Sequence, residues 1–289
     1  MTERAKRITW SAVLLAALSF LLRVDAYHRC SDAYACVTDC FGCSLSHRLR
    51  TGAAALLVDP NIAAATRFMP TIVGGRRTVP NEFPPVGALF LDSKFHCTGT
   101  LVRQRVVLTA AHCICEADST KRLDPRRLQF AFGTDALTLP PRTFRVTLTQ
   151  FPSGIPEPEF HYDPATFDDD VALVYLDPPI TDVPTFALAT KDPSLPDYYR
   201  YVGFGRVVAN QPDVGLQTTA TLHTWRVSAR RLGHGDVVRS VCLGDSGGAA
   251  LNSATIIGVT STTNNCRGGE STSVAAVRLW IDNRIRKEP

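Results

Sequence analysis

The stretch VCLGDSGGAAL, residues 241–251, carries one hydroxyl side chain, that of Ser246, with an aspartate before it and two glycines after it. A serine hydroxyl is a weak nucleophile at neutral pH, so a catalytic serine needs an adjacent base and a third group that orients the base. It also needs backbone N–H groups aimed at a developing oxyanion, and glycines keep side chains away from those groups. Taken alone, the stretch also fits a simple turn. A catalytic role for Ser246 therefore requires a base and an orienting group elsewhere in the chain.

Two further stretches supply those groups. In VVLTAAHCIC, residues 106–115, His112 ends an apolar run and stands directly before Cys113. A lone histidine is more often a buried structural residue, but its small neighbours here favour a functional one. In FDDDVALVYL, residues 167–176, a surface turn accounts for Asp168 and Asp169. Asp170 borders the apolar strand and is expected to be drawn inward, where a carboxylate must be paired.

The main body of the chain predicts an all-β domain. Short apolar or β-branched runs recur between Pro, Gly and Asp residues, which is typical of a barrel or sandwich. These runs are VGALFL, TLVRQRVVLTA, LQFAFG, FRVTLTQF, VALVYL, YVGFG, TATLHTWRV and AALNSATIIGVTST. In SVAAVRLWIDNRIRKE, near the end, the apolar residues follow helical spacing instead, which predicts a C-terminal amphipathic helix covering the barrel.

The composition is that of a globular protein, with 45% hydrophobic and 20% charged residues in 289. The net charge of +4 does not indicate nucleic-acid binding, because residues 72–289 carry 23 basic and 22 acidic side chains. No nucleic-acid partner is expected.

The N-terminus predicts export. Three basic residues precede the apolar run 8–22, and small residues flank a possible cut after Ala26, so residues 1–26 are predicted to be a signal peptide. The run is short for the ~20 residues that span a bilayer, which makes an uncleaved anchor the weaker alternative. We expect a secreted protein, extracellular or periplasmic, with no membrane span after signal removal.

Export places the nine cysteines in an oxidising compartment, where disulfides are the default. Four lie close together at Cys30, Cys36, Cys40 and Cys43. They could bind a metal, but local disulfides are favoured in a secreted chain. The odd total leaves at least one thiol free or paired between chains.

Taken together, the motifs resemble those of trypsin-like serine proteases of the chymotrypsin fold, over residues 72–289. The motifs stand in the family's order: IVGG at 72–75, TAAHC at 109–113, DVALV at 170–174, YVGFG at 201–205, GDSGG at 244–248 and WI at 280–281. The resemblance implies two six-stranded antiparallel β-barrels and a C-terminal α-helix. Residues 27–71 are then a cysteine-containing propeptide.

The resemblance implies a role for each candidate residue. Ser246 attacks the scissile carbonyl, His112 takes its proton and later gives it to the leaving amine, and Asp170 holds the imidazole. The N–H groups of Gly244 and Ser246 form the oxyanion hole. The expected substrates are proteins or peptides, with no cofactor and no metal, and the enzyme is expected to act as a monomer.

The resemblance also implies a zymogen. Cleavage before Ile72 frees an α-amino group that pairs with Asp245, whereas the uncut chain is expected to leave the serine loop disordered or misplaced. Thr71 stands at the cut, where most relatives have Arg or Lys, so a trypsin-like activator is not expected. Self-activation is one hypothesis and a separate activating protease is the other.

The resemblance pairs Cys97 with Cys113 and Cys242 with Cys266. It offers no partner for Cys115, which could reach a leader cysteine or stay a free thiol.

Substrate preference is expected to depend on a pocket whose floor is Ser240, six residues before the serine, where Arg/Lys-cutting relatives have aspartate. Val241 makes this floor more apolar. The other predicted lining residues are Ser261, Thr263 and Gly269, with Thr262 where tryptophan is usual. A partly filled, uncharged slot favours small or medium apolar side chains at the P1 position.

Two alternatives remain. One is a catalytically silent binding protein on the same scaffold, although such relatives generally lack one of the three catalytic groups. The other makes the 45-residue leader the functional part, as an adhesive or inhibitory module.

Overall fold

The structure is a computed structural model, and it describes residues 72–138, 140, 142–206 and 215–286. The predicted signal peptide, the leader and the cluster Cys30 to Cys43 lie outside the described residues. The strands are β1 (Arg76–Arg77), β2 (Val86–Leu91), β3 (Lys94–Arg103), β4 (Val106–Thr109), β5 (Leu128–Phe132), β6 (Phe144–Gln150), β7 (Ala172–Asp177), β8 (Ala187–Leu188), β9 (Asp197–Gly203), β10 (Thr218–Arg226), β11 (Arg231–His234), β12 (Ala249–Asn252), β13 (Thr255–Thr263) and β14 (Gly269–Ser273). The helices are two 3-10 turns, Ala111–Cys113 and Pro125–Arg127, and the α-helix α4 (Arg278–Ile285).

The first barrel closes in the strand order β2-β3-β4-β7-β6-β5, with every pair antiparallel. In β6 buried and exposed residues largely alternate, as expected where one face of a strand meets the core and the other meets water. Gly87 of β2 is needed for packing, because a Cβ there would come within 2.6 Å of the Phe130 ring. This barrel therefore has a dense aromatic interior.

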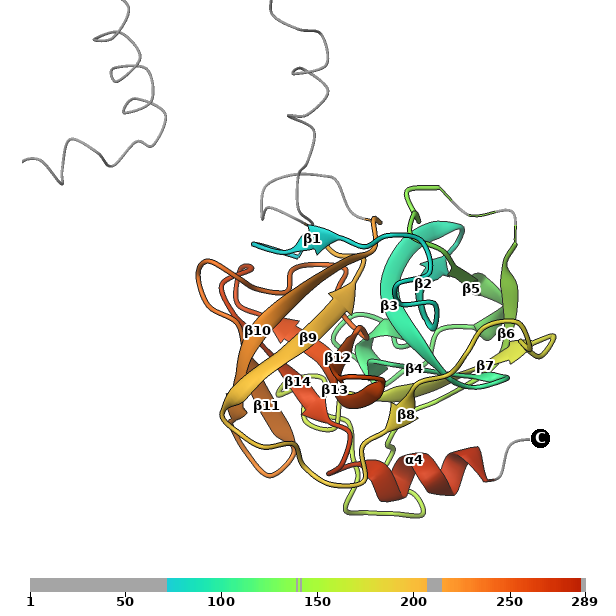
Figure 1. The fold of residues 1–289 in the computed structure, drawn as a ribbon. Helices are drawn as coiled ribbons and strands as arrows, with labels where there is room; N and C mark the ends of the chain where they lie inside the picture. The colour runs from blue at the N-terminus through green and yellow to red at the C-terminus, as the bar shows by residue number, and fades with distance from the viewer. Residues whose placement is uncertain (1–71, 139, 141, 207–214, 287–289) are drawn as a thin grey trace, which may run out of the picture. The chain divides into compact units, whose positions relative to one another are not determined.

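The second barrel runs β9-β10-β11-β14-β13-β12 and closes through the pairing of β12 with β9. Figure 1 shows its strands in colours from yellow-orange to red, beside the first barrel, whose strands run from teal through green to yellow. Two short strands extend it: β1 pairs with β10, and β8 pairs with β13 in parallel. The predicted pair of six-stranded antiparallel barrels is confirmed, with the β8–β13 contact as a parallel addition.

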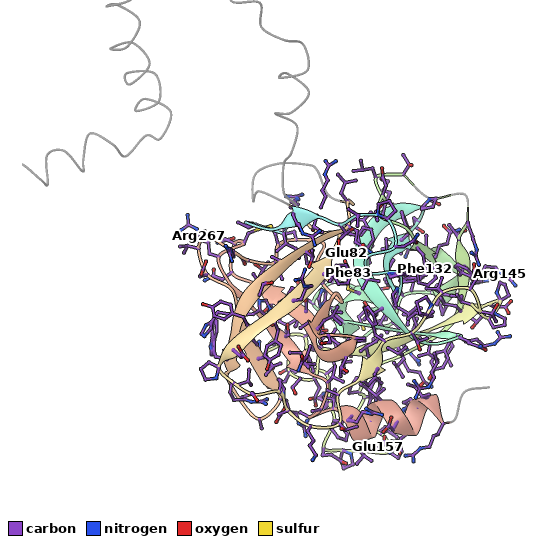
Figure 2. The ribbon with its side chains drawn as sticks, viewed as in Figure 1. Glu82, Phe83, Phe132, Arg145, Glu157 and Arg267 are labelled. Atoms are coloured by element: carbon purple, nitrogen blue, oxygen red, sulfur yellow. A yellow bond between two sulfur atoms is a disulfide. The ribbon has the colours of Figure 1, made fainter. Side chains whose placement is uncertain are left out.

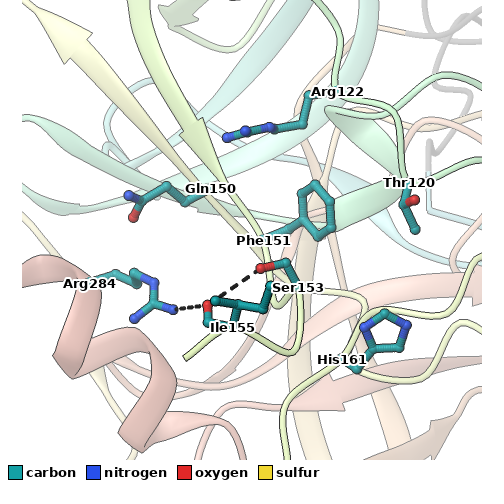
Figure 3. A pocket seen from close by; sticks show the side chains of 8 residues that line it. All are labelled: Thr120, Arg122, Gln150, Phe151, Ser153, Ile155, His161 and Arg284. Atoms are coloured by element: carbon teal, nitrogen blue, oxygen red, sulfur yellow. Dashed lines mark hydrogen bonds between the residues drawn. The ribbon is translucent and has the colours of Figure 1, made fainter. Parts of the chain in front are cut away.

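Helix α4 confirms the predicted C-terminal helix. Its residues Trp280 and Ile281 are buried, and its Arg284 forms a 2.6 Å ion pair with Glu157, which Figure 2 labels beside the helix. Arg284 also donates to the carbonyl of Ile155 at 3.2 Å. Arg284 and Ile155 form part of the wall of a pocket of about 430 Å³, which Figure 3 shows together with Phe151 and Arg122.

None of the described helices combines the length and the apolar character needed to cross a lipid bilayer.

Candidate active site

Strand pairing in the first barrel brings His112 to Asp170. Strand β4 ends at Thr109 opposite Ala172 of β7, and a 3-10 turn then carries His112, while Asp170 stands two residues before Ala172. Two residues that are 58 positions apart in sequence are thus held at the same end of one strand pair.

The imidazole and the carboxyl group are in direct contact. Nδ1 of His112 lies 2.7 Å from Oδ2 of Asp170, and the backbone N–H of His112 donates to Oδ1 at 3.0 Å. Asp170 is completely buried, as expected from the sequence, while His112 is partly exposed. Nδ1 is held by the carboxylate, and the other ring nitrogen, Nε2, lies 3.7 Å from the sulfur of Cys113.

Ser261 of β13 also binds this carboxyl group. Its hydroxyl donates to Oδ2 of Asp170 at 2.5 Å, and Thr272 donates to the Asp170 carbonyl at 2.9 Å. The sequence placed Ser261 along the substrate-binding wall and did not reveal this contact, because it joins residues 91 positions apart. The second barrel therefore helps to hold the aspartate of the first.

The loop that carries Ser246 packs on the strand ends next to His112. The carbonyl of Ser246 accepts from the N–H of Thr98 at 2.8 Å, and the Thr98 hydroxyl donates to the carbonyl of Gly244 at 2.9 Å. Gly247 has φ +79°, and a Cβ there would overlap Thr109 Oγ1 and the Thr98 carbonyl. Only glycine lets the loop approach this closely. Among the described residues no hydrogen bond joins the Ser246 hydroxyl to His112; what the structure shows is the close approach of the serine loop to Thr98, Thr109 and Ala110, two residues before His112.

Two N–H groups of this loop are available to a ligand. Within the described chain, the N–H groups of Gly244 and Ser246 have no hydrogen-bond acceptor. Gly244 has φ +99°, and a Cβ there would lie 2.9 Å from the Phe95 ring and 3.0 Å from Gly205. The positive φ and the lack of space both explain the glycine.

The side chain of Asp245 is turned into the protein interior. Its carboxyl group is 1% exposed and accepts from the N–H groups of Gly205, at 2.7 Å, and Cys242, at 2.8 Å. Burial raises the pKa of Asp245 to about 7. These two N–H donors hold the Asp245 carboxyl group in place within the serine loop.

Ile72 is fully buried, and its N–H donates to the Thr218 hydroxyl at 3.0 Å. The next residue, Val73, forms a bridge with Ser240, which joins the segment after the predicted cut to the predicted pocket floor.

Four of the residues predicted to line the pocket, Ser240, Val241, Thr263 and Gly269, are connected by hydrogen bonds and strand pairing, directly or through Gly268. The buried Ser240 hydroxyl donates to the Val241 carbonyl at 2.8 Å and accepts from the N–H of Gly268 at 2.7 Å. The Thr263 hydroxyl lies 3.0 Å from the Val241 carbonyl, and Gly269 is the strand partner of Thr263. These contacts are all between uncharged groups.

Comparison with known proteins agrees with this geometry. The family profile described as Trypsin matches residues 72–281, most of the chain. The chain belongs to the trypsin family. Trypsin beta of Drosophila erecta is 24% identical over 73% of this chain and 87% of that protein. Brachyurin of Leptuca pugilator is 30% identical over 59% of this chain and 62% of that protein. The structure of human heparin binding protein has the same fold, with a TM-score of 0.64 and 20% identity over 75% of this chain and 98% of that one.

As a trypsin-family member, the chain is a serine endopeptidase with disulfides on both sides of its site. Cys97 bonds to Cys113 beside His112, and Cys242 bonds to Cys266 beside the serine loop. The sulfurs of Cys97 and Cys113 lie near the His112 ring, but a disulfide offers no thiolate to a metal. Cys115 is buried and forms no disulfide with another described cysteine, and burial raises the pKa of its thiol to about 12.

This trypsin-family site includes features that the sequence did not reveal. The ring of Phe167 stands edge-on to the His112 ring at 5.7 Å between centroids. His234 of β11 is fully buried against Tyr201 and Gly269, and neither ring nitrogen has a partner in the described chain. Asp169, expected in a surface turn, is instead buried and paired with Arg230 at 2.5 Å. Its φ of +51° turns the carboxylate toward the N–H of His161 at 2.9 Å.

Proposed function

We propose that this serine endopeptidase cuts peptide bonds with Ser246 as nucleophile, His112 as general base and then acid, and Asp170 as the group that orients the imidazole. The observation that carries the proposal is the 2.7 Å contact between the His112 ring and the buried Asp170 carboxyl group. Asp170 keeps the proton on Nδ1 and leaves Nε2 to take the proton of the Ser246 hydroxyl. The free N–H groups of Gly244 and Ser246 then stabilise the oxyanion.

A fluorophosphonate probe tests this assignment, because it reacts with an activated serine and not with an ordinary one. Labelling at Ser246 that disappears in His112→Ala is the expected result. Absence of labelling in cleaved, folded protein would favour the alternative of a catalytically silent binding protein. One structural neighbour, 20% identical, is named for binding heparin, and the probe distinguishes that kind of function from catalysis.

We infer that the chain is made as a zymogen and activated by cleavage before Ile72. Asp245 is a buried acid without an ion-pair partner among the described residues, and a buried carboxylate is costly unless a cation meets it. The α-ammonium group of a new N-terminus at Ile72 supplies that cation. Activity that appears only after cleavage, with Ile72 identified by N-terminal sequencing, is the expected result.

The pocket supports a preference for small or medium apolar P1 side chains. Ser240 brings no charge to the floor, and both hydrogen bonds of its hydroxyl are already satisfied by backbone groups. A basic side chain would enter without a carboxylate partner. A peptide-library cleavage profile tests this, and a preference for Arg or Lys would contradict it.

The small residue Thr71 before the cut fits the same preference, so self-activation is the favoured route over a separate protease. Expression of the Ser246→Ala zymogen tests it: normal appearance of the Ile72 N-terminus in that variant would exclude self-cleavage.

Secretion to the extracellular medium or the periplasm completes the proposal, with protein or peptide substrates and a monomeric enzyme. It is supported by the N-terminal pattern of basic, apolar and small residues and by the two disulfides. Mass spectrometry of the exported protein tests removal of residues 1–26.

A further inference from the structure

The backbone nitrogen of Ile72 has a side-chain partner that none of the sequence motifs indicates. Its N–H donates to the hydroxyl oxygen of Thr218 at 3.0 Å, and both residues are fully buried. The Thr218 hydroxyl in turn donates to the carbonyl of Gly203 at 3.4 Å, a long hydrogen bond. With its hydrogen directed to Gly203, the Thr218 oxygen presents a lone pair to the nitrogen of Ile72.

Thr218 reaches this position because it begins β10. In the strand register it lies opposite Gly203 of β9 on one side and Arg77 of β1 on the other. Threonine is stiff at χ1, so the strand fixes the direction of the hydroxyl group.

Gly203 also lies against the carboxyl group of Asp245. A Cβ at Gly203 would overlap Asp245 Oδ1, and the N–H of Gly205 donates to the same oxygen at 2.7 Å. Thr218 and Asp245 therefore contact Gly203 from β10 and from the serine loop, respectively. Thr218 holds the nitrogen of Ile72 at 3.0 Å, and Asp245 lies on the other side of Gly203 from Thr218's strand.

We propose that Thr218 is a positioning residue that accepts a hydrogen bond from the new α-ammonium group and directs it toward Asp245. The proposal rests on activation by cleavage before Ile72. Hydrolysis of the Thr71–Ile72 bond adds one water: the carbonyl carbon of Thr71 gains an oxygen and becomes a carboxylate, and the nitrogen of Ile72 leaves as an amine and takes up protons to become an ammonium group. This group has three N–H donors, and burial requires that they be bonded as well as charge-paired. Asp245 takes one of them and the Thr218 hydroxyl takes another.

Nearby charges do not substitute for this arrangement. The shift in the pKa of Asp245 comes from burial, opposed by the N–H groups of Cys242 and Gly205, and no charged side chain contributes to it. On β1, Arg76 and Arg77 are exposed, and Arg76 is paired with Glu82. No charged side chain of the described residues interacts with the Asp245 carboxyl group, so the proposal assigns the alkaline limit of activity to the freed amine and its pairing with Asp245.

The test compares three variants cleaved to the same Ile72 N-terminus, confirmed by sequencing. Thr218→Val removes the hydroxyl at nearly constant volume, and Thr218→Ser retains it. Thr219→Val is the matched control, because Thr219 is the next residue of β10, is also buried, and bonds instead to the Tyr201 carbonyl at 2.9 Å. The readouts are kcat/KM against pH from 6 to 11 and the rate of fluorophosphonate labelling.

Loss of the acceptor lowers the pKa of the α-ammonium group, so Thr218→Val should lose activity at a lower pH than the wild type. We expect its alkaline midpoint to fall by about one pH unit and its activity at pH 9 by about tenfold, one pH unit being a tenfold change in the proton equilibrium. Thr218→Ser and Thr219→Val should retain the wild-type profile.

A wild-type alkaline limb in Thr218→Val, or an equal shift in Thr219→Val, would overturn the proposal and leave Thr218 a packing residue. If Thr218→Val does not fold, Thr218→Ala against Thr218→Ser gives the same comparison, and equal profiles overturn it. If cleavage before Ile72 fails to raise the activity of the wild type, the activation mechanism is wrong instead.

Discussion

The His112 ring is held by a carboxyl group that both barrels supply with hydrogen bonds. Oδ2 of Asp170 lies 2.7 Å from His112 Nδ1 in the first barrel and 2.5 Å from the Ser261 hydroxyl of the second. Because Asp170 is completely buried, its charge depends on these donors instead of water. The arrangement couples the orientation of the imidazole to the fit between the barrels, and several expected outcomes depend on it.

Replacing Asp170 with Asn should preserve the fold and reduce kcat by about 10⁴-fold, because an amide in this position favours the wrong imidazole tautomer. The measurement is steady-state kinetics on cleaved enzyme, with circular dichroism to confirm folding. Asp168→Asn is the matched control, since Asp168 lies two residues away and is exposed. An equal loss of activity in both variants would contradict the role of Asp170.

Ser261→Ala should reduce kcat by about tenfold, less than Asp170→Asn, because it removes one of several donors to the carboxylate and a hydrogen bond to a charged group is worth about 1.5–3 kcal/mol. Thr100→Val is a suitable control, since the buried Thr100 hydroxyl has no partner in the described chain. Unchanged kinetics in Ser261→Ala would show that the contact does not support catalysis.

Ser240→Asp should move the P1 preference toward Arg and Lys. A carboxylate at the pocket floor offers an incoming basic side chain the partner that serine lacks. The substitution also removes the hydroxyl group that accepts a hydrogen bond from the N–H of Gly268, so a lower overall kcat/KM is expected. The measurement is the ratio of kcat/KM for substrates differing only at P1, and an unchanged ratio would mean that Ser240 does not form the floor.

His234 should make stability depend on pH in the acidic range. Burial lowers its pKa to about 4, below the value of about 6.5 expected in the unfolded chain. Between these values the unfolded chain binds the proton and the folded chain does not, so stability is full above pH ~6.5 and declines as pH falls toward 4. For His234 the free energy of unfolding is expected to decrease by on the order of 3 kcal/mol over this pH range. Urea denaturation of wild type and His234→Leu at pH 7 and pH 5 measures it, and the variant should lose less stability on acidification.

Asp245→Asn should have opposite effects before and after cleavage. In the uncut chain the pKa of Asp245 is raised to about 7. The protonated carboxyl group is therefore compatible with the folded state at low pH, and the free energy of unfolding decreases as pH rises from about 4 through 7. Asparagine at this position does not ionise, so its free energy of unfolding should not decrease in this pH range. The uncut variant should be at least as stable as the uncut wild type at pH 8. In the cleaved protein it removes the partner of the α-ammonium group, and activity should fall by roughly 10² or more, given about 3–5 kcal/mol for breaking a buried ion pair.

The comparison uses Ser246→Ala protein for the denaturation experiments, so that self-cleavage does not interfere. Equal activity of cleaved Asp245→Asn and wild type would remove Asp245 from the activation mechanism.

The sequence by itself determined the barrels, the helix and the identities of the catalytic candidates. Runs such as VGALFL and FRVTLTQ carry their burial pattern in their own residues, and β2 and β6 form where they were expected. Glycines 244 and 247 likewise mark positions where a backbone must approach another closely. The burial pattern of a strand and the need for glycine at a positive φ depend on a residue and its near neighbours in the chain, so the sequence is enough to predict them.

Tertiary structure alone decided the contacts between distant segments. Strand β14, GESTS, is polar in sequence yet buried at its last three residues, because neighbouring segments cover both of its faces: Thr272 donates to the Asp170 carbonyl and Ser273 to the Asp192 carboxylate. Ser261 bonds to Asp170 and Thr218 meets Ile72 only after the strands have taken their register, and no local pattern encodes a contact across 91 or 146 positions. The register between paired strands decides which partner each hydroxyl group contacts, and this register exists only in the folded protein.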